Sequence, residues 1–186
     1  MWWRVNLALG GLFALLLMLF GYTKPLDSLP LHPHCNSTVM EGFAKEAKEL
    51  HSAMDACTDS CNLRENITVP KTGVNFNERD KMERDMQEAE IWRGLMLFMT
   101  AIPKVKEIIT DSSLKNHTDK SYRHIRSLIS FLKGLNGKQG ETMRTSDLAQ
   151  ATTYVQTMKD FFLYYFNFVR WKVKQYVKKV CQNTQR

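Results

Sequence analysis

Four cysteines are the residues of this chain best suited to covalent chemistry. Cys57 and Cys61 are close neighbours in the sequence, whereas Cys35 and Cys181 lie near its two ends. Three sets of pairs are possible, and Cys57–Cys61 with Cys35–Cys181 is the simplest of them. A Cys57–Cys61 bond would require a helix to end or tighten by Cys57, because disulfide-bonded Cβ atoms lie closer together than helical neighbours. A zinc site is the rival use of these residues, but the spacing does not suit it.

Three asparagines begin the sequence Asn-x-Ser/Thr, which is the acceptor for N-linked glycans. They are Asn36, Asn66 and Asn116. Each falls between the helices predicted below, so we expect all three at the surface if they are glycosylated.

Catalytic and metal-binding patterns are missing from the sequence. It has no GxSxG, no HExxH and no glycine-rich phosphate loop. His32 and His34 are the closest pair of histidines, and they lie in a proline-rich stretch that would hold a metal poorly. We therefore predict that the chain is not an enzyme and uses no cofactor or metal.

One stretch near the C-terminus combines cations with a large aromatic side chain. On a helix, Asn167, Arg170, Lys174 and Lys178 lie opposite the apolar stripe, and Trp171 lies with them. Charges alone would indicate a solvated face, but tryptophan and arginine are typical of binding hot spots. We expect an interface here, although Trp171 could instead pack beneath a loop.

A second, weaker candidate surface lies on the preceding helical stretch. Arg123, Ser127 and Phe131 form a row along one side, with Arg126 beside them. Phe131 at a polar edge is consistent either with an interface or with a contact to the rim of the core.

Four amphipathic patterns must position these residues. The periodic stretches run over about 39–54, 79–109, 120–135 and 148–180. Thr38 and Glu41 form a capping-box pattern before the first helix, and Pro103 should kink or end the second. With no convincing sheet, the pattern predicts an all-α four-helix bundle.

The second helix has a methionine-rich row that we interpret as its core face and not as a cofactor site. Its members are Met82, Met86, Ala89, Trp92, Met96 and Met99.

Connection lengths predict how the helices run. About 20 residues join the first two helices, far more than antiparallel neighbours need, so these helices should be parallel and joined by a long crossover. The second connection is short and suits an antiparallel pair. The third, about 136–147, is long enough to run back along a helix. The prediction is an up-up-down-down bundle with long crossover loops.

The first crossover carries a strand-like stretch, CNLRENITVPKTGVNF, at 61–76. Residues 67–69 and 74–76 are rich in β-branched or aromatic side chains, while Pro70 and Gly73 prevent one continuous helix. The pattern predicts a surface loop with some strand propensity.

The start of the chain reads as a secretory leader. Arg4 precedes an uncharged apolar run over 7–20, which is too short to span a bilayer comfortably. We predict a signal peptide at 1–23, cleaved between 21 and 28, and one secreted domain at 24–186 without stable membrane insertion. Loss of Arg4 lowers the formal net charge from +7 to +6. In an extracellular chain this charge favours a protein or glycosaminoglycan partner, not nucleic acid.

Beyond these patterns, the sequence resembles the erythropoietin/thrombopoietin family of helical cytokines. The resemblance rests on CNLRENITVPKTGVNF, WRGL, HIRSLISFLKGL and NFVRWKVKQY, in the right order along the mature chain. It implies a monomeric secreted hormone that drives red-cell progenitor survival and maturation. It also implies two copies of a single-pass cytokine receptor as partner, and disulfides joining the end cysteines and the Cys57–Cys61 pair.

The family uses two unequal receptor faces. Carried over, the stronger face, here face 1, comprises Thr72, Val74, Asn75, Phe76, Asn167, Arg170 and Lys172, to which the helical pattern adds Trp171 and Lys174. The weaker face, face 2, comprises Arg126, Ser127 and Phe131, with Arg123 added from the helical row.

Several positions depart from the family. Gly73 stands for a lysine and Trp171 for a glycine of face 1, and Gly42 for an arginine of face 2. Of the three glycan acceptors, Asn66 alone matches a mammalian position. Two alternatives stay open: a thrombopoietin-type cytokine, and a basic glycosaminoglycan-binding secreted protein.

Overall fold

A computed structural model describes residues 35–55, 61–73, 75–136 and 151–184. They belong to one unit that begins at His34. The predicted signal peptide and its cleavage site lie outside the described residues, as do Cys57, Val74 and the segment 137–150.

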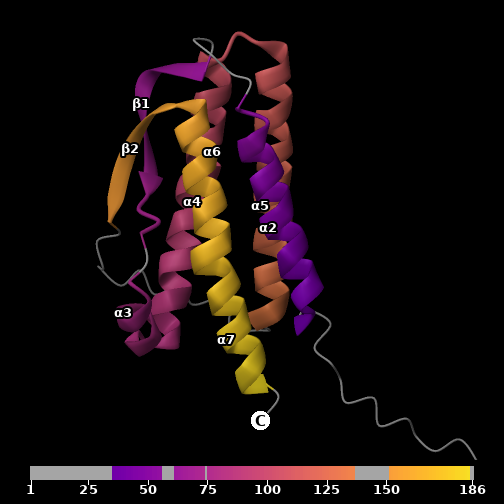
Figure 1. The fold of residues 1–186 in the computed structure, drawn as a ribbon, viewed down its shortest axis with the longest axis vertical. Coiled ribbons are helices and arrows are strands. Elements are labelled where there is room, and N and C mark those ends of the chain that lie inside the picture. Colours follow the sequence, from indigo (N-terminus) through magenta and orange to yellow (C-terminus); the bar gives the residue numbers. More distant parts are fainter. Residues whose placement is uncertain (1–34, 56–60, 74, 137–150, 185–186) are drawn as a thin grey trace, which may run out of the picture. The chain divides into compact units, whose positions relative to one another are not determined.

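Helices dominate the described chain, in the order that the sequence predicts (Figure 1). The elements are α2 (Ser37–Ser52), β1 (Asn62–Pro70), α3 (Phe76–Lys81), α4 (Arg84–Ile108), α5 (Ser112–Asn136), β2 (Thr152–Thr157), α6 (Met158–Asn167), the π-helix η4 (Phe168–Val173) and α7 (Lys174–Thr184). α6, η4 and α7 follow one another without a break and together form the predicted fourth helix.

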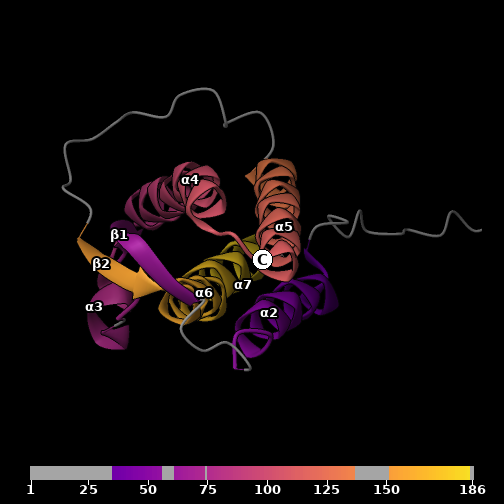
Figure 2. The same ribbon diagram turned by 90° about the horizontal axis from the view of Figure 1, so that it is seen from above.

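The predicted topology is confirmed. α2 and α4 run in one direction, and α5 and the α6–α7 stretch run in the other (Figure 1). Seen from above, these four rods surround one core (Figure 2). The chain is therefore an up-up-down-down four-helix bundle, in which β1 belongs to the first crossover and β2 to the second.

The absence of a sheet was a wrong prediction. β1 and β2 pair antiparallel, with Ile67 opposite Val155 and Val69 opposite Thr153. Ile67, Val69 and Val155 are buried, so the ribbon adds its apolar face to the core. The sequence pattern assigned 152–157 to the fourth helix, but β-branched residues there favour a strand. The helix starts only at Met158, where the Thr157 hydroxyl accepts a hydrogen bond from the Asp160 N–H at 3.0 Å.

Helix ends also differ from the predictions. The second helix is divided, because Met82 is extended between α3 and α4. Pro103 lies inside α4 and does not end it. The N-cap of α2 is Asn36, whose side chain accepts from the Thr38 N–H at 2.9 Å, so the predicted capping box does not form.

The core face of α4 is not the methionine row. Met86 and Met96 are 37% and 48% exposed, and among that row Trp92 alone is buried. The buried face instead consists of Ile91, Leu95, Phe98, Ile102 and Val105. Because α4 is apolar on two sides, periodicity alone could not decide between them. Larger, stiffer side chains occupy the interior.

Phe98 of α4 is at the centre of an aromatic cluster. Its ring lies 5.2 Å from that of Tyr165 and 5.6 Å from those of Phe161 and Phe168, in edge-to-face arrangements. All four side chains are essentially inaccessible to solvent. The cluster joins the second helix to the fourth.

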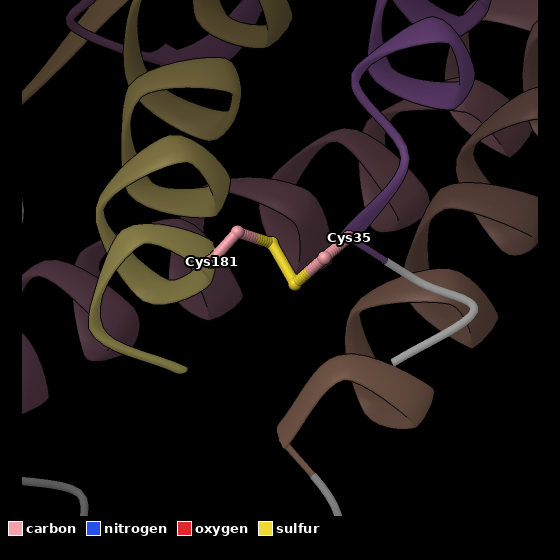
Figure 3. Close-up of a disulfide and its surroundings, with 2 residues drawn as sticks. All are labelled: Cys35 and Cys181. Carbon is pink, nitrogen blue, oxygen red and sulfur yellow. A yellow bond between two sulfur atoms is a disulfide. The ribbon is translucent and has the colours of Figure 1, made fainter. Parts of the chain in front are cut away.

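A disulfide joins Cys35 and Cys181, as predicted (Figure 3). The two residues are 146 positions apart, and their Cα atoms are separated by 5.4 Å. The bond fixes the start of α2 beside the end of α7. Cys61 is also disulfide-bonded, whereas its predicted partner, Cys57, lies outside the described residues.

We expect Phe98→Ala to lower the free energy of unfolding by about 3–5 kcal/mol, because it empties a fully buried aromatic site. Met96→Ala, on the opposite side of the same helix, should change it by less than about 0.5 kcal/mol. Chemical denaturation of both variants measures these changes. A larger loss for Met96→Ala would mean that α4 is turned the other way.

Candidate functional site

Face 1 is built on a contact between the first crossover and the fourth helix. The Lys172 ammonium of η4 donates to the backbone carbonyl of Lys71 at 2.6 Å and to a carboxylate oxygen of Glu90 at 2.5 Å. Arg79 of α3 donates to the other oxygen of Glu90 and, at 3.2 Å, to the Lys172 carbonyl. We call Arg79, Glu90 and Lys172 the ion cluster.

The ion cluster is largely withdrawn from water. The side chains of Arg79 and Lys172 are 6% and 7% exposed, and that of Glu90 is 24% exposed. Burial raises the pKa of Glu90, but the hydrogen bonds and charges of Lys172 and Arg79 outweigh it, so the pKa lies below its ordinary value. The carboxylate is therefore ionised at neutral pH and balances part of the buried positive charge.

Lys172 does not have the surface position that we expected for a receptor contact. Its side chain is committed to Glu90 and to the Lys71 carbonyl. Lys172 is buried because it lies in the π-helix η4. A π-helix turns less per residue than an α-helix, so side chains point in different directions from those that a regular helix predicts. Lys172 and Val173 are consequently both buried, directly after the exposed Arg170 and the half-buried Trp171. Lys172 supports face 1 from beneath.

Arg170 is the exposed cation of face 1. Its guanidinium carbon lies 4.5 Å from the centre of the Trp171 ring and 5.7 Å from that of Phe166. Such cation–π contacts restrain a long side chain. The Trp171 ring thus packs against the Arg170 guanidinium and restrains it.

The other face 1 residues differ in exposure. Asn75 is exposed, Thr72 is buried, and Asn167 is half-buried. Lys174 pairs with Glu41 of α2 at 2.5 Å. Phe76 begins α3 and does not extend the strand-like stretch.

Face 2 lies mainly on α5. Arg123, Arg126 and Ser127 are exposed there. Phe131 is only 9% exposed, and its ring packs 5.5 Å from that of Phe43 on α2. Phe131 is therefore a rim residue of the core, the second of its two open interpretations.

A buried histidine lies on the same helix as face 2. His124 Nδ1 is 2.5 Å from the Tyr165 hydroxyl, and Nε2 is 3.6 Å from a carboxylate oxygen of Glu46. Burial, and then the charge of Glu46, raise the pKa of Tyr165, so its hydroxyl is protonated at neutral pH. Burial lowers the pKa of His124, and this outweighs the opposing effect of Glu46.

The three glycan acceptors are all exposed. Asn36 is the N-cap of α2, Asn66 lies in β1 and Asn116 lies within α5. The expectation that all three fall between helices holds for Asn36 and Asn66 but is wrong for Asn116. At Asn36 the side-chain oxygen makes the capping bonds, which leaves the nitrogen that would carry a glycan outside them.

Two glycines that replace charged residues of the family leave room for a side chain. A Cβ added at Gly42 or Gly73 would meet no atom within 4 Å. Packing therefore requires glycine at neither position.

Sequence reasoning missed Arg79 and Glu90, which form the ion cluster with Lys172. It also missed Glu88, which accepts hydrogen bonds from Trp92 at 3.2 Å and from the Tyr176 hydroxyl at 2.8 Å. The available signal was a pair of acidic residues next to apolar ones, since α4 carries Glu88 and Glu90 beside buried Ile91 and Trp92.

In the part of the chain that the structure describes, no group of three or more histidine, cysteine or acidic side chains could hold a metal ion. No helix there is long and apolar enough to cross a membrane.

Comparison with known protein families identifies the family to which this chain belongs. Residues 32–184 match the family described as erythropoietin/thrombopoietin. The chain belongs to the erythropoietin/thrombopoietin family. It is an erythropoietin-type cytokine, and the family consists of hormones and cytokines, not enzymes.

Members of this family from fish and mammals are similar over nearly their whole length. The erythropoietin of Epinephelus coioides is 34% identical over 164 residues, which cover 88% of this chain and 89% of the relative. That of Equus caballus is 36% identical over 186 residues, covering 93% and 96%. That of Danio rerio is 34% identical over 164 residues, covering 88% and 90%.

We expect acidification to destabilise the wild type more than a His124→Gln variant. The pKa of His124 in the folded chain lies below the ordinary 6.5, so the unfolded chain takes up the proton first as pH falls. The stabilisation that depends on neutral His124 is complete above about pH 6.5 and is lost as pH falls through the lower folded pKa. Denaturant unfolding on both sides of this window measures the difference.

His117→Gln, at a less buried position of the same helix, is the matched control. It should keep the pH dependence of the wild type. If His124→Gln also keeps it, another group causes the acid sensitivity.

Proposed function

We propose that this cytokine is a secreted glycoprotein hormone that binds two copies of the erythropoietin receptor and promotes survival, proliferation and differentiation of red-cell progenitors. Face 1 binds the first receptor and face 2 the second, which brings the receptor-associated kinases together. The hormone itself acts as a monomer.

The observation that carries this proposal is the attachment of the first crossover to the fourth helix. Residues from two segments about a hundred positions apart, around Lys71 and Lys172, are joined directly. Arg170, its aromatic support and the exposed Asn75 accordingly belong to one fixed framework. A rigid surface with an anchored arginine and a tryptophan suits a high-affinity contact.

Face 2 consists of exposed polar side chains on α5, next to the buried Phe131. Arg123 and Arg126 are exposed. The cation–π contacts found among the described residues belong to Arg170 of face 1. Ordering such side chains on binding costs conformational entropy. This is consistent with face 2 being the weaker of the two.

We expect Arg170→Glu to weaken binding of the first receptor on the order of a hundredfold, because a charge reversal near the middle of an interface costs several kcal/mol. Surface plasmon resonance with the soluble receptor ectodomain measures it. Lys104→Glu, an equal charge change at an exposed position of α4, is the control and should bind normally. If Arg170→Glu binds the receptor with normal affinity, the assignment of Arg170 to face 1 is refuted.

Arg126→Glu should leave first-receptor affinity within about twofold yet abolish signalling, because it affects only the second contact. Proliferation of receptor-bearing cells and receptor-free parental cells measures this. Lys133→Glu, also exposed on α5, serves as the control. Signalling of Arg126→Glu at wild-type potency would place the second contact elsewhere.

A further inference from the structure

Two ends of one short segment are fixed at the same place in the fold. Its first residue, Lys71, accepts a hydrogen bond from Lys172, and its last, Arg79, donates to Glu90 and to the Lys172 carbonyl. We call residues 71–79 the suspended segment. All face 1 residues of the first crossover lie within it.

Glu90 is the group that these two attachments share. One carboxylate oxygen accepts from Lys172 at 2.5 Å and the other from Arg79 at 2.5 Å. Within the described residues, it is the carboxylate paired with both cations. We propose that Glu90 is a positioning residue for receptor binding, which holds the suspended segment in its receptor-competent form from a helix that contributes no residue to face 1. This inference rests on the proposed function of face 1.

The electrostatics explain why a single carboxylate has this effect. Arg79 and Lys172 are both buried, and Arg79 Nε has no hydrogen-bond partner. Without the charge of Glu90, two cations would remain desolvated beside one another, which is strongly unfavourable. The least costly response is for the Arg79 side chain to turn towards water. This loosens one end of the segment, which then keeps the hydrogen bond from the Gln87 side chain to the Arg79 carbonyl at 2.7 Å.

The described residues between the two ends of the suspended segment are mostly exposed. Thr72 is buried, but Gly73 and Asn75 are exposed. Asn75, the N-cap of α3, makes no capping bond with its side chain. Its order therefore depends on the two ends, and a released segment would have to be ordered again on binding.

The test is Glu90→Gln, which keeps the shape of the side chain and removes its charge. We expect faster hydrogen exchange across residues 71–82 of the free protein, with unchanged protection of α5. Affinity for the soluble erythropoietin receptor ectodomain should fall about tenfold or more, mainly through slower association. Glu49→Gln is the matched control, because it removes an exposed ion pair, that of Glu49 on α2 with Lys120 on α5, which involves no residue of either face, and it should change neither quantity.

A double-mutant cycle separates positioning from a general loss of stability. Asn75→Ala should weaken binding in the wild type but add little in a Glu90→Gln background, since the segment is already released there. Additive losses would overturn the proposal. If Glu90→Gln does not fold, Glu90→Gln combined with Lys172→Gln, which removes one anion and one cation, should fold and show the same faster exchange.

Exchange and binding also separate this proposal from the proposed function. Unchanged exchange across 71–82 in a folded variant overturns the positioning role, whatever the receptor does. If exchange quickens but the wild type does not bind the ectodomain, the receptor assignment fails and Glu90 only orders the segment. In that case the positioning role in receptor binding is refuted as well.

Discussion

The pairing of Glu90 with Lys172 and Arg79 is the interaction on which, in our proposal, the receptor-binding surface depends. Helix packing alone would define a bundle, but it would leave the first crossover without a fixed course over the fourth helix. A buried ion pair is a poor general source of stability, because desolvation offsets much of its attraction. Its value here is geometric, because it joins a cation of α3 and a cation of η4 to one carboxylate of α4.

The β-ribbon and the disulfide constrain the molecule in different places. The ribbon pairs the two long crossovers with each other and covers part of α4 and α6 (Figures 1 and 2). The disulfide joins the outer ends of the first and fourth helices. Between them, the aromatic cluster around Phe98 fills the interior. The disulfide thus joins the first helix to the fourth, and the aromatic cluster joins the second helix to the fourth.

Much of the fold follows from local patterns and connection lengths. The helix order, the topology and the Cys35–Cys181 bond could all be predicted, because each depends on periodicity, reach or the number of partners. The β-ribbon could not, since its strands are 90 positions apart at Asn66 and Gln156 and neither is convincing alone. Lys172 was misplaced for a similar reason: its partner Glu90 is 82 positions away, and the π-helix shifts the exposed side of the helix. The prediction of which face of α4 is buried was wrong, because two sides of this helix are apolar.

The bond between Cys35 and Cys181 has a consequence for how the molecule responds to proteases. Because it closes a covalent ring around nearly all the described residues, one cut in either crossover would leave both pieces attached to each other. A nicked hormone would keep its mass under non-reducing conditions and could still hold its four helices together. Release of a fragment would need a second cut or a reductant.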